Sequence, residues 1–466
     1  MTTLTRSSVP GTLPAVLSAA GLTEGAAAAM GEWRGDPDWV QRLRAEGWEA
    51  WESIPLPTSS TEGWRRSDLR WLELDAVVPA VASAPQVARL EGLPAELRAQ
   101  LQTDFEEGGL IVQQDGTTIY ADVQDTLRQQ GVIFTDLHTA FHEHRDLLAP
   151  YFMQLLPPRW RPGMPSNAGK FEALNAALFN GGAFIYVPPD TTVALPLRSV
   201  LWAANRQAGF FPRTLIVVDR GARLVYVDEY RSAEGERGQP LTFGSGAVEI
   251  YVRDGAHLDY VTVQEWSLNT GGFLTQRATL GNDAYINWVM VSLGGQYSRA
   301  TADILLQGKG TKADLLGLAF GEGTQVFDVH TLQGHLSPFT DSDQLYKTGL
   351  RDRARVAYEG LIDIRKGSYG SNGFQANKNL LLDDTAKADS IPMLEISDND
   401  VRCTHSSSVG PVDQESVYYL MSRGLPRPLA ERILVQGFFE PVIERIGVEA
   451  LRDRIRGAID RKIGDR

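Results

Sequence analysis

The chain has 466 residues, of which 43% are hydrophobic and 22% are charged, so it can bury a large core and is not disordered. Its formal net charge of −13 argues against broad contact with nucleic acid phosphates or with an anionic membrane. The single cysteine, Cys403, excludes an internal disulfide and the common structural zinc sites, which need at least two cysteines. No run of about 18 apolar residues occurs, and together with the lone thiol this predicts a cytoplasmic protein.

Residues 1–105 are predicted to form a mostly helical N-terminal region. Within residues 38–51, Trp39, Leu43 and Trp48 recur among charged residues at near-helical spacing. Pro55 then ends the helix, because proline cannot supply the backbone N–H that a helix needs.

Residues 106–402 are predicted to form a β core, with entry helices at 136–179. Residues 110–112 and 117–120 have the pattern of a hairpin around a short polar turn. After Gly182 the helical period disappears, and short apolar or alternating segments follow, separated by Gly, Asp and Asn turns.

A five-residue pattern recurs inside this core: Ala, any residue, an aliphatic residue, any residue, and usually an aromatic residue. Copies begin at Ala222, Ala256, Ala284 and Ala354, with a weaker copy at Ala313. A strand repeat without intervening helices is typical of stacked coils. The steps are irregular and mostly shorter than a propeller blade, so a parallel β-helix is favoured over a propeller, and a β-sandwich remains the alternative.

Residues 403–466 are predicted to form a C-terminal helical domain. Val417, Leu420 and Met421 share one face of a first helix, and Gly424 ends it in a Schellman-like position. Two further amphipathic helices follow. The predicted fold is therefore mainly β, a β-helix core flanked by N-terminal and C-terminal helical regions.

The sharpest chemical feature is the pair Cys403 and His405. Residues i and i+2 of a strand point to the same face, so the thiol and the imidazole are expected side by side. A thiolate is a soft ligand for iron or sulfur, imidazole also binds iron, and a nearby protonated histidine favours the thiolate. Two ligands are too few for a cluster, so the others must come from another chain. The simpler interpretation of an isolated cysteine is a small buried hydrophobe.

Two other groups of residues are weaker candidates. His138 and His142, four apart in a predicted helix, have a spacing that can bind zinc, but a solvated helix face is the stronger interpretation. Paired acids on a β-helix could instead act on a polysaccharide, although turn formation is the simpler role of these residues. The acids in question are Asp341, Asp343, Asp363, Asp383 and Asp384.

Several ordered motifs resemble the SufB/SufD family of iron–sulfur cluster assembly proteins. They are Trp64–Asp68, Phe171–Asn175, Gln375–Asn377, Asn379–Leu382, Pro392–Ile396, Asp400–Gly410, Tyr418–Gly424 and Gly437–Phe439. Within the family the chain is more similar to SufD than to SufB. Ser406 stands where SufB typically has Glu, and the second functional cysteine of SufB is missing.

The resemblance implies a right-handed parallel β-helix in a non-catalytic scaffold subunit of the SufBCD complex. It implies pairing with SufB through the β-helix and docking of the SufC ATPase on the C-terminal helices. Whether the isolated chain forms a homodimer stays open. His405, together with Cys403, would hold a transient iron–sulfur cluster shared with SufB, and no cofactor would be bound permanently.

The SufC-contacting residues are less well defined. Tyr418, Tyr419, Arg423 and Gly424 are the candidates, although the helical period favours core packing for the first three. Two alternatives stay open: a SufB-type subunit that accepts sulfur on Cys403, and the polysaccharide-acting enzyme.

Overall fold

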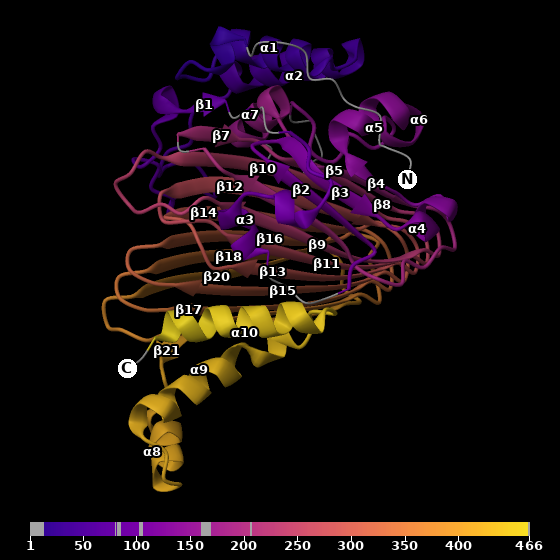
Figure 1. The fold of residues 1–466 in the computed structure, drawn as a ribbon. Helices are drawn as coiled ribbons and strands as arrows, with labels where there is room; N and C mark the ends of the chain where they lie inside the picture. The colour runs from indigo at the N-terminus through magenta and orange to yellow at the C-terminus, as the bar shows by residue number, and fades with distance from the viewer. Residues whose placement is uncertain are drawn as a thin grey trace.

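The computed structural model describes residues 14–79, 81, 85–101, 106–159, 169–205 and 207–464. Over these residues the chain winds between two sheets that lie face to face, which gives a parallel β-helix flanked by helices at both ends of the sequence (Figure 1). The predicted fold class is therefore confirmed. Residues 1–13 of the predicted N-terminal region, and residues 160–168 of the predicted entry helices, lie outside the described part.

The strands alternate between the two sheets along the core. The first sheet runs in the order β20 (Lys387–Ile396), β18 (Arg355–Ile364), β16 (Val326–His335), β14 (Tyr297–Leu306), β12 (Thr270–Leu280), β10 (Thr242–Val252), β8 (Arg213–Val218), β5 (Ala183–Val187) and β4 (Ile133–Asp136), with β7 (Ala208–Phe210) beside β10 and β1 (Val78–Pro79) beside β7. The second runs in the order β21 (Arg402–Pro411), β19 (Asn372–Leu381), β17 (Asp341–Leu350), β15 (Lys312–Gly321), β13 (Tyr285–Ser292), β11 (His257–Glu265), β9 (Arg223–Ser232), β6 (Leu197–Ala203), β2 (Gly109–Gln114) and β3 (Thr117–Val123).

The helices lie around the two sheets (Figure 1). They are α1 (Glu24–Arg34), α2 (Asp38–Ser53), α3 (Ala95–Gln100), α4 (Asp125–Gln129), α5 (Leu137–Glu143), α6 (Arg145–Leu148), α7 (Lys170–Leu178), α8 (Gln414–Ser422), α9 (Arg427–Ile443) and α10 (Glu449–Ile463). Of these, α3 to α7 alternate in sequence with the first strands. The predicted hairpin is present as the antiparallel pair β2 and β3. No helix of the described residues is long and apolar enough to cross a membrane.

The alanine repeat is only partly in register in the folded coils. Leu258 pairs with Leu224 on one side and with Ile286 on the other, so the first three copies stack as predicted. Ala313, however, pairs with Ile286 rather than with Ala284, which puts the fourth copy two residues out of register. The copy at Ala354 precedes β18 and belongs to the other sheet. The coil requires only an inward apolar residue at each level, and several strand positions satisfy that requirement.

The interior of the first coils is apolar and aromatic. Tyr226 and Tyr260 stack with ring centroids 5.9 Å apart, and Trp288 follows at 5.4 Å from Tyr260. All three side chains are buried among aliphatic residues from the first sheet, such as Ile250 and Ile304. This column of in-register residues is the core that holds the two sheets together.

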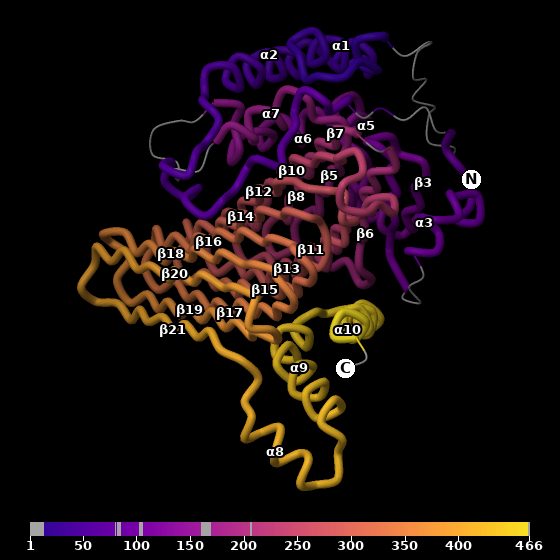
Figure 2. Tube along the Cα trace, turned by 90° about the vertical axis from the view of Figure 1, so that its left-hand side faces the viewer, coloured from indigo at the N-terminus to yellow at the C-terminus, as the bar shows by residue number. Residues whose placement is uncertain are grey.

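The helices cover the outer faces of the two sheets. On the first sheet, Phe171 of α7 stacks on Phe273 of β12 with centroids 3.8 Å apart. On the second sheet, Val261 and Leu318 pack against Phe439 of α9 and Ile455 of α10. Figure 2 shows α1 and α2 over the N-terminal coils, α10 beneath the second sheet, and α8 standing away from the body.

The boundary between β core and C-terminal helices differs from the prediction. The last strand, β21, runs from Arg402 to Pro411, and the first C-terminal helix begins at Gln414. Residues 403–411 are therefore strand rather than helical domain. They pair residue by residue with β19, and this pairing outweighs the weak strand preference of their serines.

Candidate functional site

The C-terminal end of the β-helix is open. β20 and β21 are the last strands of their sheets, and within the described residues no strand pairs with their outer edges. Most residues of both strands are exposed or half-buried, in contrast to the strands one coil earlier. At this end Ser407 of β21 donates to the Ser390 hydroxyl of β20 over 2.8 Å, which joins the two sheets.

Cys403 and His405 lie on β21 at this open end. Cys403 pairs with Gly373 of β19, and a Cβ on Gly373 would lie 3.5 Å from the Cys403 Sγ and 3.5 Å from His335 Nε2. His335 is fully buried, so the thiol faces the interior of the coil. His405, two residues on, shares that face. The thiol is half-buried and the imidazole is exposed, because no further coil covers them.

The electrostatics of Cys403 differ from the expectation. Partial burial raises the pKa of the Cys403 thiol above its ordinary value, and this desolvation outweighs any help to the thiolate from His405. The thiol is therefore protonated at neutral pH and needs a metal ion or an added cation to ionise. No group of three or more His, Cys, Asp or Glu side chains in the described residues is placed to hold a metal ion. Cys403 and His405 are thus two side chains of metal-binding type, without a third placed beside them among the described residues.

The coil interior next to His405 is polar. Gln375, which pairs with His405 across the ladder, donates its amide N–H to Tyr358 Oη over 3.0 Å. Gln344 donates to the same hydroxyl over 2.5 Å and to Thr331 Oγ1 over 2.6 Å. The side chains of Thr331, Gln344, Tyr358 and Gln375 are all buried. No local sequence pattern marks this cluster, although the segment Gln375–Asn377 is one of the motifs that carry the family resemblance.

The four candidate contacts for SufC lie on and after α8, away from the coil. Tyr418 is 73% exposed and Tyr419 is 57% exposed, so the core packing that the helical period favoured for them is wrong. Arg423, likewise exposed, donates to Tyr419 Oη over 3.3 Å. Gly424 has φ +94°, and Leu425 N–H donates to Leu420 C=O, which closes the predicted Schellman turn. α8 has two exposed faces because it has little of the protein to pack against (Figures 1 and 2).

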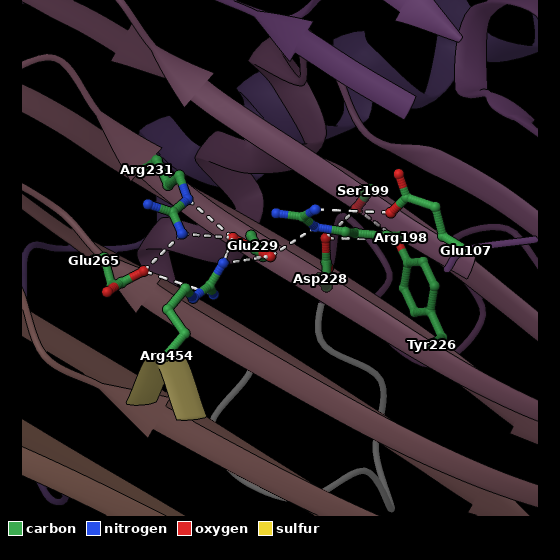
Figure 3. A network of polar contacts seen from close by, with 9 residues as sticks. All are labelled: Glu107, Arg198, Ser199, Tyr226, Asp228, Glu229, Arg231, Glu265 and Arg454. Atoms are coloured by element: carbon green, nitrogen blue, oxygen red, sulfur yellow. Dashed lines mark hydrogen bonds and ion pairs between the residues drawn. The ribbon is translucent and has the colours of Figure 1, made fainter. Parts of the chain in front are cut away.

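The C-terminal helices are fixed to the second sheet by a buried ion network, which Figure 3 shows. The fully buried carboxylate of Glu229 accepts from Arg198 of β6 at 2.8 Å, from Arg231 of β9 at 2.7 Å and from Arg454 of α10 at 3.0 Å. The three guanidinium groups hold the pKa of Glu229 well below its usual range in spite of its burial. The sequence does not predict this network, because each of its residues has the pattern of an ordinary surface charge on its own strand or helix.

The weaker candidates do not form sites in the described residues. The rings of His138 and His142 lie 5.1 Å apart, but the described residues supply no third ligand that would complete a metal group. The five aspartates are dispersed. Asp341 and Asp343 lie on β17, Asp363 on β18 pairs with Arg365 at 2.6 Å, and residues 383 and 384 lie in the turn after β19. Asp383 and Asp384 line a common surface pocket together with Arg427 and Glu431, whereas the other three lie on β17 and β18 and are not among the residues that line it.

Comparison with known proteins assigns the family. A family model described as "SUF system FeS cluster assembly, SufBD core domain" matches residues 201–438. The chain belongs to the SufB/SufD family. It is 31% identical over 431 residues to the iron–sulfur cluster assembly protein SufD of Bacillus subtilis, covering 92% of this chain and 95% of that protein. It is also 28% identical over 437 residues to iron–sulfur cluster assembly SufBD family proteins of Staphylococcus saprophyticus and Staphylococcus epidermidis, covering 92% of this chain and 90% of each relative.

These matches confirm the family, the SufD type and the role in iron–sulfur cluster assembly that the sequence motifs predicted. The matched range of the SufBD core domain runs from β6 to α9 and includes Cys403, His405, Tyr418 and Tyr419.

Proposed function

We propose that this chain is a non-catalytic scaffold subunit of a cytoplasmic SufBCD complex. In this proposal its open coil end pairs with SufB, its C-terminal helices dock the SufC ATPase, and Cys403 and His405 contribute ligands to an iron–sulfur cluster that forms between the two β-helices. The cluster is the cargo of the complex, and the chain binds it only in transit.

The observation that carries the proposal is the position of both candidate ligands on an unprotected edge strand. Natural proteins protect long edge strands with prolines, lysines or covering elements. β20 carries Pro392 in its middle, whereas β21 from Cys403 to Gly410 contains no Pro, Lys, Arg, Asp or Glu. A strand from SufB that pairs with β21 would cover both ligands and could complete their coordination shell. In the isolated chain the same edge could pair with a second copy.

The support for SufC docking is the exposed apolar surface of the C-terminal helices. Besides the two tyrosines of α8, Met421, Leu429 and Ile433 are exposed large hydrophobic residues. Aromatic residues clustered on a protruding element are typical of protein interfaces. Docking at α8 and α9 would transmit force to the coil, because the second sheet holds α9 by packing and α10 by the Glu229 network.

A non-catalytic role agrees with the chemistry of the open end. Nucleotide-driven movement of two SufC subunits would open the SufB interface, and the protein groups would then need only to bind iron and sulfide. Such a switch is a population shift driven by differential nucleotide binding, and it does not require a catalytic acid or base in this chain.

The test is a His405→Ala variant co-expressed with SufB and SufC, with the matched variant Thr404→Ala as control. Thr404 is the neighbour of His405 on the same strand, and its side chain points to the opposite face. We expect normal assembly of the complex in both variants and a large loss of cluster yield only in His405→Ala. Normal assembly with undiminished cluster yield would refute the ligand role.

The SufB-type alternative predicts that Cys403 accepts sulfur directly. A desulfurase with labelled cysteine should then label the isolated chain, and Cys403→Ser should abolish the label. The raised pKa of the Cys403 thiol disfavours this alternative, because sulfur acceptance needs a thiolate.

A further inference from the structure

The most informative feature next to the open end is the side chain of Gln375. It lies directly opposite His405 in the parallel ladder between β19 and β21. Paired residues of parallel strands point to the same face, and neighbouring strands lie about 4.8 Å apart. The Gln375 side chain is therefore long enough to reach the imidazole, and on the ladder it is the only neighbour of His405 within the described residues.

Gln375 has one amide atom bound and one unused. Its Nε2 donates to Tyr358 Oη over 3.0 Å, whereas its buried Oε1 has no hydrogen-bond partner among the described residues. A buried carbonyl oxygen without a donor is costly, so such an atom marks a place where a donor, a water or an ion can bind. Here the group nearest along the ladder that can donate an N–H is His405.

Tyr358 fixes the orientation of the Gln375 side-chain amide. Burial raises the pKa of Tyr358 to about 12, so its hydroxyl keeps its proton at neutral pH. That proton can go to Thr331 Oγ1 at 3.3 Å, which leaves the tyrosine oxygen to accept from the amides of both Gln344 and Gln375. The Nε2 of Gln375 therefore faces Tyr358, and its Oε1 is left free.

The backbone leaves room for this arrangement. A Cβ on Gly360 of β18 would lie 2.0 Å from Gln375 Nε2 and 2.4 Å from Tyr358 Oη. Any other residue at position 360 would push the two side chains apart. The Gln375–Tyr358 contact therefore joins β18 to β19, and it is supported by Thr331 of β16 and Gln344 of β17, which also bond the tyrosine hydroxyl.

We propose that Gln375 is the positioning residue of His405. In the conformation that binds iron, a rotation of the exposed His405 imidazole brings one ring N–H to this amide oxygen, which has no partner among the described residues, and leaves the other ring nitrogen unprotonated and directed out of the coil. A histidine that binds a metal commonly donates its second N–H to such an acceptor, which fixes both the tautomer and the ring orientation. The inference rests on the proposed function, because it assigns His405 the role of a ligand.

The experiment reads the tautomer directly. The full-length chain is labelled with 15N-histidine, and ring nitrogen shifts are measured near pH 8 for the wild type and for Gln375→Leu, Gln375→Glu and Gly360→Ala, with His405→Ala to assign the signal. We expect one tautomer to dominate in the wild type and in Gln375→Glu, which keeps an acceptor oxygen. In Gln375→Leu and Gly360→Ala the tautomer ratio should fall by roughly three- to tenfold, the effect of one hydrogen bond.

The outcomes separate the two proposals. Equal tautomer ratios in the wild type, Gln375→Leu and Gly360→Ala would overturn the positioning role, whatever the cluster yield of the complex. Undiminished cluster yield in His405→Ala would instead overturn the proposed function, and the tautomer measurement would still report whether Gln375 holds the ring. A purely structural role of Gln375 would lower stability in both Gln375 variants alike, without the difference between Leu and Glu in the tautomer ratio.

Discussion

Replacing Glu229 by Gln should weaken the attachment of α10 to the second sheet. The carboxylate accepts five N–H contacts, from Arg198 Nε, from Nε and Nη2 of Arg231, and two from Arg454 Nη1, at 2.7 to 3.1 Å. A neutral amide has one acceptor oxygen, and its own N–H groups would face guanidinium donors. The substitution therefore leaves buried positive charge without its partner.

The magnitude follows from that geometry. Breaking a buried ion pair by removing one partner costs about 3–5 kcal/mol, and Glu229 is fully buried. Arg454→Met should cost less, about 1–3 kcal/mol, because Glu229 keeps two of its three partners and the methionine retains much of the packing. Glu236→Gln is the matched control: the same change at an exposed carboxylate should stay within about 0.5 kcal/mol.

The assay is urea unfolding of the full chain, with hydrogen exchange followed in peptides from residues 427–463. We expect Glu229→Gln to lower the midpoint of the first transition and to speed exchange in α10 before the coil itself opens. A loss below about 1 kcal/mol, with unchanged exchange in α10, would refute the view that this network holds the C-terminal helices.

Three further predictions follow from the same structure. The pKa of Glu229 is held well below its unfolded value, so its contribution to stability is complete above about pH 4.5 and is lost as the pH falls further. The free energy of unfolding, measured at decreasing pH, should therefore depend less on pH in Glu229→Gln than in the wild type. Burial lowers the pKa of His335 from 6.5 to about 4, so between these pH values the unfolded chain binds a proton that the folded chain does not. The free energy of unfolding should therefore fall by up to about 3 kcal/mol as the pH drops from 6.5 to 4. In urea titrations repeated at each pH, His335→Gln should remove that part of the pH dependence. A Cβ on Gly47 of α2 would lie 2.7 Å from Ala177 N of α7, so Gly47→Ala should lower thermal stability by about 1–3 kcal/mol. In α10 a Cβ on Gly457 meets only Arg461 Nη1 at 3.6 Å, so Gly457→Ala should leave thermal stability equal or raise it by up to about 1 kcal/mol. Equal effects at the two glycines would contradict the tight contact between α2 and α7.

Local sequence patterns were enough to predict the stacked strands of the β-helix and the shared face of the two candidate ligand residues on its last strand. The spacing of Ala222, Ala256 and Ala284 predicted stacked strands, and those copies are in register. The alternation of a strand placed Cys403 and His405 on one face, and the structure has both on β21. These features depend on the two-residue period of a strand, which is a property of the backbone and can be read without knowing what packs nearby.

Other features depended on neighbours distant in the sequence. The periodicity of residues 417–421 could not tell whether Tyr418 and Tyr419 pack in a core, because a helix that stands away from its domain has the same apolar spacing as a buried one. The register of Ala313 depended on the length of the preceding turn. The pKa of Cys403 depended on how much of the coil surrounds the thiol.

The sequence by itself thus determined the winding of the chain and the family motifs. The tertiary structure alone decided which charges meet, as in the Glu229 network, whose residues are separated by up to 256 positions between Arg198 and Arg454. It also decided which polar atoms stay unpaired, such as Gln375 Oε1. The physical reason is that periodicity is set by bonded geometry, whereas burial, ion pairing and hydrogen-bond satisfaction are set by surfaces that meet only after folding.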